Sequence, residues 1–406
     1  MTLPEITLPA SLKSRLAAGH PWVYRTQVEA APALPSGAWV RVRCSGFVAY
    51  GLWDAESQIA IRLFSTRQLP DAAWVRERVH RAWMLREPLR TQGISACRWV
   101  FGEADGLPGV TVDTYGPFAV IQTAAESVET LLPWMVEALR MTAPLRGIVL
   151  RHRAKARGAA EEAASIQGVD EEPATVGKIE SLWGALPPRD LIVEEYGLKF
   201  RANLFEGQKT GLFLDHRENR HFLEGWCEGR TVLNCFSYTG AFSLYAARGG
   251  ALSVTSCDSA PASAREAAAN FALNGFDPNH YEFLVEDCFA LLSRYASEGQ
   301  AFDLVILDPP SFAHSKKHLH AALRGYTRLH QLALRCVRPQ GLLAAASCTS
   351  YVSPDLFKET LSQAATNLGK RLLILHEAGQ PLDHPVPAHF PEGRYLKFLL
   401  CAVQET

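Results

Sequence analysis

Two reactive side chains follow apolar segments late in the chain. Asp308 follows residues 302–307 and opens Asp308-Pro-Pro-Ser-Phe312, and Cys348 follows residues 341–346 among hydroxyl residues. A thiol beside an acid is a recurring arrangement in covalent catalysis. C5 of a pyrimidine cannot take a methyl group directly, whereas thiolate addition at C6 moves electron density to C5 if N3 is protonated or hydrogen-bonded. The pair therefore fits 5-methylcytosine formation, with Cys348 as nucleophile and Asp308 at N3. A buried packing cysteine is the alternative interpretation.

Three further polar groups follow earlier apolar segments. Asn234 begins a turn that ends at Gly240, and Asp258 and Asp287 follow the next two segments. The turn lacks the Gly-x-Gly-x-x-Gly pattern that a dinucleotide pyrophosphate requires, which favours a nucleoside cofactor without phosphate. We expect Asp258 to accept hydrogen bonds from ribose hydroxyls and Asp287 to reach an adenine amino group. Each acid alone is more often an ordinary helix cap.

These groups are separated by a regular alternation of predicted strands and helices. Strands are predicted at 231–236, 253–257, 281–285, 302–307 and 341–346, and helices at 240–247, 262–274, 289–297 and 321–337. Such alternation predicts an α/β domain, a parallel sheet with helices on both faces. Ligands of these sheets bind at the carboxyl ends of the strands, where the strand order reverses. The polar residues all fall at that edge.

The preceding half of the chain has a different pattern. A two-residue period predicts strands at 38–44, 47–53 and 58–64, a helix follows at 71–89, and a hairpin at 109–122 precedes a helix at 127–141. Residues 152–188 are rich in Ala, Glu and Gly and are interpreted mostly as a linker, before a hairpin at 191–202. We therefore predict a small β-rich domain (1–70), a central α+β domain with linker (71–188) and the α/β domain (189–406).

Composition restricts the class of protein and its partners. With 406 residues, 48% hydrophobic and 20% charged, the chain is typical of a multidomain globular protein, and its net charge of −1 provides no general attraction to nucleic acid. Any polyanion contact must come from local clusters, at Arg76, Arg78, Arg81, Arg86 and Arg90 or at Arg151, Arg153, Lys155 and Arg157. Solvated helix or loop surface is the alternative for both clusters.

Cysteine usage and the N-terminus bear on the compartment. The nine cysteines include no Cys-x-x-Cys pair, so we predict neither a disulfide framework nor a metal site. No basic segment precedes an apolar one at the N-terminus, and no apolar run is long enough to span a bilayer. A cytoplasmic location is expected.

The chain resembles the RlmI-type 23S ribosomal RNA (cytosine-C5) methyltransferases over nearly its whole length. The strongest marks are Gln208-Lys-Thr-Gly-Leu-Phe-Leu-Asp-His-Arg-Glu-Asn-Arg220, Val232-Leu-Asn-Cys-Phe-Ser-Tyr-Thr-Gly240, Asp308-Pro-Pro-Ser-Phe312, Ser347-Cys348, Asp383-His-Pro385 and Pro391-Glu-Gly-Arg-Tyr-Leu-Lys397. The resemblance implies a PUA-like N-terminal domain, a class I (Rossmann-like) methyltransferase domain, S-adenosylmethionine as cofactor, and Cys348 and Asp308 as catalytic residues. Ser311 departs from the lysine expected there, and the group that releases the covalent adduct is unassigned.

On this basis we assign candidate site residues. The predicted cofactor-binding residues are Phe213, Asp215, Arg217, Asn219, Asn234, Phe236, Ser237, Tyr238, Gly240, Asp258, Asp287 and Asp308. For Asp215, Arg217 and Asn219, helix caps and surface salt bridges are the alternative. The predicted base-binding residues are Pro309, Pro310 and Phe312, the last by stacking on a flipped-out base.

The expected substrate is 23S rRNA, protein-free or in an early assembly intermediate, because a base must leave its stack to be methylated. Two rival functions remain: N-methylation of guanine or adenine, which needs no cysteine, and a noncatalytic RNA-binding assembly factor. The sequence leaves the oligomeric state open, a homodimer included.

Overall fold

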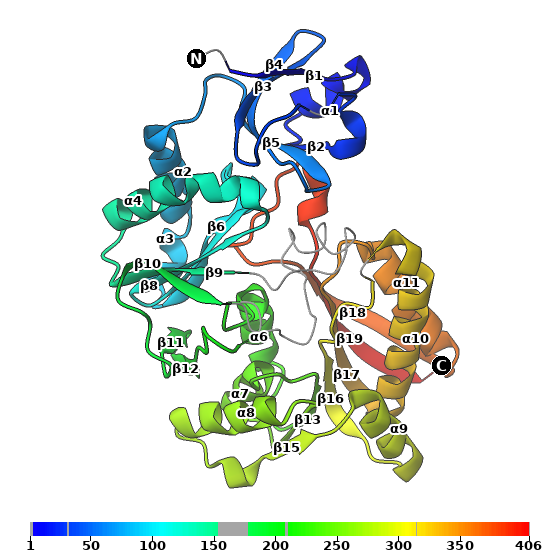
Figure 1. Ribbon diagram of the computed structural model, residues 1–406. Helices are drawn as coiled ribbons and strands as arrows, with labels where there is room; N and C mark the ends of the chain where they lie inside the picture. Colours follow the sequence, from blue (N-terminus) through cyan, green and yellow to red (C-terminus); the bar gives the residue numbers. More distant parts are fainter. Residues whose placement is uncertain (1–2, 31, 153–177, 208–209, 314, 406) are drawn as a thin grey trace. The chain divides into compact units, whose positions relative to one another are not determined.

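The computed structural model describes residues 3–30, 32–152, 178–207, 210–313 and 315–405, which form two compact units (Figure 1). The first unit comprises Met1–Val193, Ala202–Leu214 and Leu382–Gly393, and the second comprises Glu194–Arg201, Asp215–Pro381 and Arg394–Thr406. The first unit contains both predicted N-terminal domains. The domain boundaries at residues 70 and 188 stay predictions.

The first sheet of the first unit has the strand order β1-β3-β4-β5-β2. Its elements are β1 (Glu5–Thr7), β2 (Trp22–Tyr24), β3 (Trp39–Cys44), β4 (Phe47–Trp53), β5 (Ile59–Ser65), the short helix α1 (Lys13–Ala17) and the 3-10 turns η1 (Ala10–Leu12) and η2 (Arg25–Gln27). The three strands predicted from the two-residue period are confirmed as β3, β4 and β5. β5 is buried along most of its length rather than alternating, because Ile61 packs in one core with Val40 while Phe64 packs in a second with Trp74.

The second sheet of this unit has the order β10-β9-β8-β7-β6. Its elements are β6 (Ala96–Phe101), β7 (Val110–Tyr115), β8 (Phe118–Thr123), β9 (Gly147–Arg151), β10 (Ile179–Gly184), α2 (Ala72–Leu85), α3 (Glu87–Thr91), α4 (Leu132–Thr142), η3 (Gly102–Asp105) and η4 (Glu126–Leu131). The predicted hairpin at 109–122 is confirmed. The predicted helix at 71–89 is divided at Arg86, whose backbone leaves the helical region (φ −90°, ψ 4°).

The linker predicted at 152–188 is wrong in its last part. β10 pairs antiparallel with β9, from Ile179 opposite Arg151 to Gly184 opposite Gly147. The strand lies at the edge of the sheet and none of its side chains is buried, so its sequence carries little apolar periodicity. Residues 153–177 of the predicted linker lie outside the described residues.

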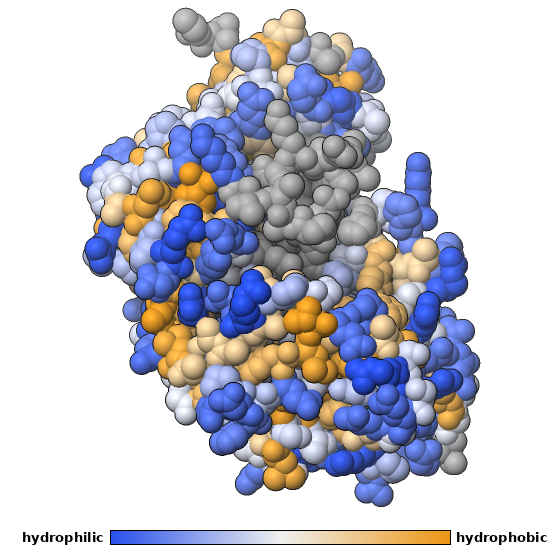
Figure 2. Space-filling view, turned by 60° about the horizontal axis from the view of Figure 1, so that its bottom comes forward, coloured by the Kyte–Doolittle hydropathy of each residue, from blue (hydrophilic) through white to orange (hydrophobic). Residues whose placement is uncertain are grey.

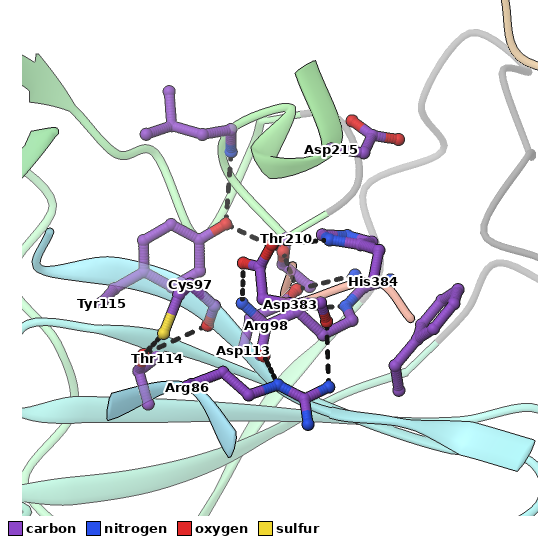
Figure 3. Close-up of polar contacts among 12 residues, drawn as sticks. Arg86, Cys97, Arg98, Asp113, Thr114, Tyr115, Thr210, Asp215, Asp383 and His384 are labelled. Carbon is purple, nitrogen blue, oxygen red and sulfur yellow. Dashed lines mark hydrogen bonds and ion pairs between the residues drawn. The ribbon is translucent and has the colours of Figure 1, made fainter. Parts of the chain in front are cut away.

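A buried network of ion pairs joins distant segments of the first unit (Figure 3). The guanidinium of Arg86 donates to both carboxylate oxygens of Asp105, at 2.6 and 2.8 Å, and to the backbone oxygen of Asp383 at 3.0 Å. Arg98 donates to both oxygens of Asp113, at 2.8 and 3.0 Å. The prediction that Arg86 contacts RNA phosphates is therefore wrong, because its side chain is fully buried and committed to this network.

The second predicted basic cluster also contains a buried arginine. Arg151 is buried and donates to the backbone oxygen of Gly207. Arg153, Lys155 and Arg157 lie outside the described residues. Buried arginines cannot be distinguished by spacing from solvated ones, because both kinds lie on helices and strands beside apolar residues.

The second unit is built on a seven-stranded sheet with the order β15-β14-β13-β16-β17-β19-β18. Its strands are β13 (Thr231–Cys235), β14 (Ser253–Asp258), β15 (Glu282–Val285), β16 (Phe302–Leu307), β17 (Val337–Ser347), β18 (Lys370–Ala378) and β19 (Lys397–Glu405). The five predicted strands are confirmed as β13 to β17. The strand order reverses between β13 and β16, whose carboxyl ends define the crevice expected of such sheets.

Helices cover both faces of this sheet (Figure 1). They are α6 (Arg217–Glu224), α7 (Ala241–Arg248) and α8 (Pro261–Leu273) on one face, and α9 (Cys288–Glu298), α10 (Leu319–Arg335) and α11 (Pro354–Thr366) on the other. Shorter elements are the hairpin β11 (Ile192–Glu195) and β12 (Leu198–Arg201), which confirms the predicted one, and the 3-10 turns η5 (Leu214–His216), η6 (Pro278–His280), η7 (Lys316–His318) and η8 (Pro391–Gly393).

The five predicted strands pair in parallel, as predicted, and the sheet also contains β19, which the prediction did not include. This strand is antiparallel to both β17 and β18. Residues 379–396 connect β18 to β19 without an α-helix, whereas a parallel neighbour requires a crossover connection, usually helical.

The described helices include none that is long and apolar enough to cross a membrane. Hydrophilic and hydrophobic residues are interspersed over the face shown in Figure 2. All nine cysteines are free and buried, which confirms the packing role expected for most of them.

Candidate active site at the carboxyl edge of the sheet

The turn after β13 is held in an unusual backbone conformation. Phe236 and Tyr238 have φ values of +60° and +45°, in the left-handed region that side chains other than glycine seldom adopt. Such residues cost of the order of 1–3 kcal/mol each and gather at functional sites. Three hydrogen bonds fix the turn: the backbone N–H groups of Phe236, Ser237 and Tyr238 donate to Cys288 Sγ (3.1 Å), Cys257 O (2.9 Å) and Asp258 Oδ2 (2.9 Å).

Gly240 ends this turn and caps helix α7 at φ +75°. A Cβ atom at this position would lie 2.8 Å from Cβ of Ala267 on α8. Glycine is therefore required here by the packing of α8 as well as by the backbone angle. The predicted close approach of a ligand is a separate reason that stays a prediction.

Asp258 ends β14 with both carboxylate oxygens fixed. Oδ2 accepts from the backbone of Tyr238 and Oδ1 from the backbone of Ala260, each at 2.9 Å. The side chain is half-buried, and each oxygen keeps a lone pair for a further donor. This arrangement can accept hydrogen bonds from a vicinal diol such as a ribose.

Asn234 lies one strand residue before the turn and is buried. Its amide nitrogen donates to Ser243 Oγ at 2.9 Å, and Ser256 Oγ donates to the same oxygen at 2.7 Å. Among the described residues, nothing donates to its Oδ1. An unsatisfied buried acceptor is costly, so this oxygen is a point where a ligand donor or a water would be stabilising.

Asp287 differs from Asp258 in being exposed. It caps α9 by accepting from the backbone of Ala290 at 2.9 Å, which is the ordinary role of an Asp at this position. Its predicted contact with adenine stays a prediction.

The segment 215–219 is internal. Asp215, Arg217 and Asn219 are all buried, and Arg217 donates to the partly exposed carboxylate of Glu218 at 3.0 Å, as the salt-bridge alternative expects for this residue. Asp215 Oδ2 accepts from the hydroxyl of Tyr395 at 2.6 Å. Phe213 is partly exposed and belongs to the first unit, so its predicted place at the cofactor stays a prediction.

Asp308 ends β16 and has a histidine neighbour that the sequence interpretation missed. Nε2 of His216 lies 3.2 Å from Asp308 Oδ1, although its direction does not meet hydrogen-bond geometry. Nδ1 of His216 lies 3.1 Å from the amide nitrogen of Asn219. In the tautomer in which that amide donates, Nδ1 is the acceptor and the hydrogen is on Nε2, the ring nitrogen nearer to Asp308.

Phe312, in the loop after Asp308, packs at the edge of the domain core. Its ring centroid lies 4.6 Å from that of Tyr326 and 6.1 Å from that of Phe289. The ring is partly exposed, Pro310 is exposed and Pro309 is buried. Stacking of Phe312 on a base stays a prediction.

Cys348 follows β17 directly and is 4% exposed. Its Sγ lies 3.9 Å from the backbone oxygen of Pro309. Because β16 and β17 are parallel neighbours, the loop that begins at Asp308 and the thiol meet at one edge. The predicted proximity of Cys348 and the Asp308 loop is therefore present in the fold.

Lys397 is a second residue that sequence reasoning left without a role. It begins β19 opposite Ser347 and is 4% exposed. Its Nζ donates to the backbone oxygens of Thr349 and, at 2.8 Å, Tyr395. Burial lowers the pKa of this amine to about 7, an effect that Arg394 increases and Cys348 opposes.

Comparison with known protein families identifies the class. Residues 178–378 match the family model of the S-adenosylmethionine-dependent methyltransferases, and residues 6–66 match that of a PUA-like domain. The chain is an S-adenosylmethionine-dependent methyltransferase with a PUA-like N-terminal domain, which confirms the predicted fold class and cofactor.

Individual relatives identify the family. A Shewanella denitrificans protein named ribosomal RNA large subunit methyltransferase I is 35% identical over 98% of this chain and 99% of its own length. A Salmonella choleraesuis protein of the same name is 34% identical over 98% of each chain. The chain belongs to the ribosomal RNA large subunit methyltransferase I family.

Solved structures agree on the fold. A protein described as a methyltransferase complexed with SAH superimposes with a TM-score of 0.84 at 23% identity, covering 98% of this chain and 100% of that chain. An S-adenosylmethionine-dependent methyltransferase from Streptococcus mutans gives 0.83 at 22% identity, with the same coverage.

Proposed function

We propose that this protein transfers a methyl group from S-adenosylmethionine to C5 of a cytidine in 23S ribosomal RNA, through a covalent adduct with Cys348. The observation that carries the proposal is the convergence of the thiol with the loop of Asp308, where Cys348 Sγ lies 3.9 Å from the oxygen of Pro309. N-methylation would need the loop but not the thiol. The family name of the relatives supports the large-subunit RNA as substrate.

The residues at the ends of β13 and β14 fit the cofactor. Asp258 offers two fixed carboxylate oxygens to ribose hydroxyls, and the buried Oδ1 of Asn234 lacks a donor among the described residues. When bound, S-adenosylmethionine supplies an electrophilic methyl group. The chain itself must supply the activation of the base.

That activation is assigned to two side chains. The thiolate of Cys348 forms a bond to C6, and the electron pair of the C5–C6 double bond moves toward C5 and N3. Asp308, as a carboxylic acid, donates to N3, which takes up this electron pair, while Nε2 of His216 lies 3.2 Å from its Oδ1. Once C5 carries the methyl group, loss of the C5 proton to a base that is not assigned re-forms the C5–C6 double bond, and return of the S–C6 electron pair to sulfur regenerates the thiolate.

RNA contact is assigned in part to the first unit. A groove of about 550 Å³ runs between the first sheet and α2, and its lining includes Arg67, Arg78 and Arg81 together with Phe47 and Trp74. Arginines beside aromatic rings suit phosphates and unstacked bases. A target base must leave its stack, which favours protein-free 23S RNA or an early assembly intermediate in the cytoplasm.

The test uses RNA in which cytidine is replaced by 5-fluorocytidine. Fluorine prevents loss of the C5 substituent, so the wild type should form an RNA–protein adduct that survives denaturant. Cys348→Ala should form none and should lose methylation, while keeping its affinity for the cofactor. Cys401→Ala, which removes a buried thiol from the same sheet, is the matched control and should form the adduct.

Other outcomes identify the rivals. Full methylation by Cys348→Ala would favour transfer to an exocyclic nitrogen. Methylation absent from the wild type, with RNA binding intact, would favour an assembly factor.

A further inference from the structure

Lys397 is a buried lysine, and no carboxylate partner is found for it among the described residues. It is 4% exposed, and among the described residues no ion pair joins it to Asp or Glu. Buried lysines are rare unless a negative charge compensates them. When this amine takes up a proton, the resulting ammonium therefore requires a different counter-ion.

One neighbouring group can provide it. Among the described residues, the charges that act most on Lys397 are those of Cys348, after β17, and Arg394, just before β19. Arg394 is positive and repels the ammonium. Asp215, which contacts the segment just before this strand, is engaged by the hydroxyl of Tyr395. Deprotonated Cys348 is the counter-ion that remains.

The hydrogen bonds of Lys397 leave one position on its nitrogen that can accept a proton from Cys348. A neutral amine has two N–H donors and one lone pair, whereas an ammonium has three donors. The backbone oxygens of Thr349 and Tyr395 accept two N–H bonds. Thr349 follows Cys348 directly, and Ser347, which precedes it, lies across from Lys397, so Lys397 is held by both sequence neighbours of Cys348.

We propose that Lys397 is the proton acceptor and counter-ion of Cys348. The thiol proton moves to the lone pair of the neutral amine, the S–H electron pair stays on sulfur, and an ammonium–thiolate pair results. The same ammonium stabilises the thiolate when the S–C6 bond breaks at the end of the reaction. This inference rests on the proposed covalent function, because it needs Cys348 to be the nucleophile.

Burial lowers the pKa of Lys397 to about 7, so the amine can accept a proton near neutral pH. The thiol and the amine titrate as a pair, and the rate of adduct formation should rise with an apparent midpoint that belongs to both. Without the cation, the midpoint should move to that of a buried, uncompensated thiol, above the usual value of about 8.5.

The experiment measures the rate of adduct formation on 5-fluorocytidine RNA from pH 5.5 to 10. Lys397→Met should lower the rate at pH 7 by about 10- to 100-fold, shift the midpoint upward by more than one pH unit, and recover much of the rate at high pH. Lys397→Arg, which keeps the charge, should keep the midpoint closer to that of the wild type. Cofactor affinity, which should not change, checks that the variants are folded.

A second measurement on the wild type needs neither RNA nor a variant. Alkylation by iodoacetamide is followed for each cysteine by mass spectrometry as the pH is raised. Cys348 should react with a midpoint near neutrality, whereas Cys401, whose pKa is raised to about 12 by burial, should react only at high pH. This result decides the matter if Lys397→Met fails to fold.

Two outcomes separate the failures. An adduct that forms in the wild type and in Lys397→Met with the same pH midpoint would leave Lys397 a structural role and overturn the inference alone. The absence of an adduct in the wild type at every pH would overturn the covalent function, and the inference with it.

Discussion

The carboxyl edge of the seven-stranded sheet has two halves that treat their polar side chains differently. At β13 and β14, the carboxylate of Asp258 is held by the backbone N–H groups of Tyr238 and Ala260. At β16 and β17, Asp308 and Cys348 have side chains, His216 and Lys397, as neighbours. Backbone donors cannot titrate, so they fix both position and charge. Side-chain neighbours can exchange protons.

This difference separates binding from chemistry. A carboxylate with two backbone donors is pre-organised for ligand hydroxyls, which suits recognition. An acid beside an imidazole, or a thiol beside an amine, can change its protonation state during a reaction. The edge at β13 and β14 is thus a rigid half assigned to the cofactor, the cofactor half. The edge at β16 and β17 is a titratable half assigned to the base, the base half. The two halves meet where the strand order reverses.

The largest effect is expected in the base half, for Asp308→Asn. The amide cannot exchange a proton with N3, so kcat should fall by about 10²- to 10⁴-fold while cofactor affinity changes far less. Single-turnover methylation of 23S RNA and calorimetry with S-adenosylmethionine measure the two quantities. His216→Gln, which keeps a donor near Asp308, should lose much less activity than His216→Phe.

An equal effect of Asp308→Asn on cofactor binding and on the reaction rate would contradict this prediction. If Asp308→Asn weakened cofactor binding as much as it slowed the reaction, the two halves would not be separate in function, because a residue of the base half would act in binding.

An intermediate effect is expected in the cofactor half, for Asp258→Ala. Loss of hydrogen bonds from an ionised group costs about 1.5–3 kcal/mol, which raises the Kd for S-adenosylmethionine about 10- to 100-fold. Saturating cofactor should restore most of kcat, since Asp258 is assigned no proton transfer. Asp287→Asn is the comparison within the same half: Asp287 is exposed and caps α9 through one hydrogen bond, so its variant should change Kd only a few-fold. Equal losses for the two acids would show that backbone fixation is not what makes Asp258 important.

The strands and turns that form both halves can be predicted from the sequence, but only some of the reactive side chains can. The five strands β13 to β17 have long apolar runs between polar turns, and parallel pairing then brings Asp258, Asp308 and Cys348 to one edge regardless of details. That inference needs only the order of elements. It also separates Cys348, which comes directly after its strand has ended, from Cys235, Cys257 and Cys401, which lie within strands of the same sheet.

The partners of those residues could not be predicted in the same way. His216 precedes Asp308 by many residues, and Lys397 reaches Cys348 only because β19 is inserted antiparallel beside β17. Pairing of that kind depends on tertiary register, which has no local signal. The buried state of Arg86 is similar, since the carboxylate of Asp105 and the backbone oxygen of Asp383 accept its hydrogen bonds from two separate segments.

The smallest effect is expected outside both halves, in the groove of the first unit. Arg81 is exposed and pairs with Glu77, and the guanidinium of Arg78 lies 4.8 Å from the ring centre of Trp74. Replacing Arg78 and Arg81 by alanine should raise the Kd for RNA several-fold and reduce the slope of log K against log salt by about one unit for each phosphate that the protein no longer neutralises. Arg76→Ala is the matched control, because Arg76 is exposed on the same helix but does not line the groove.

Filter binding of 23S RNA fragments over a range of salt gives the Kd for RNA and its salt slope, and calorimetry gives the affinity for the cofactor. Neither cofactor affinity nor the rate of the bound RNA should change, because the groove contributes no residue to either half of the sheet edge. A salt slope equal to that of the wild type would remove the groove from the RNA-binding surface and leave the division between the two halves intact.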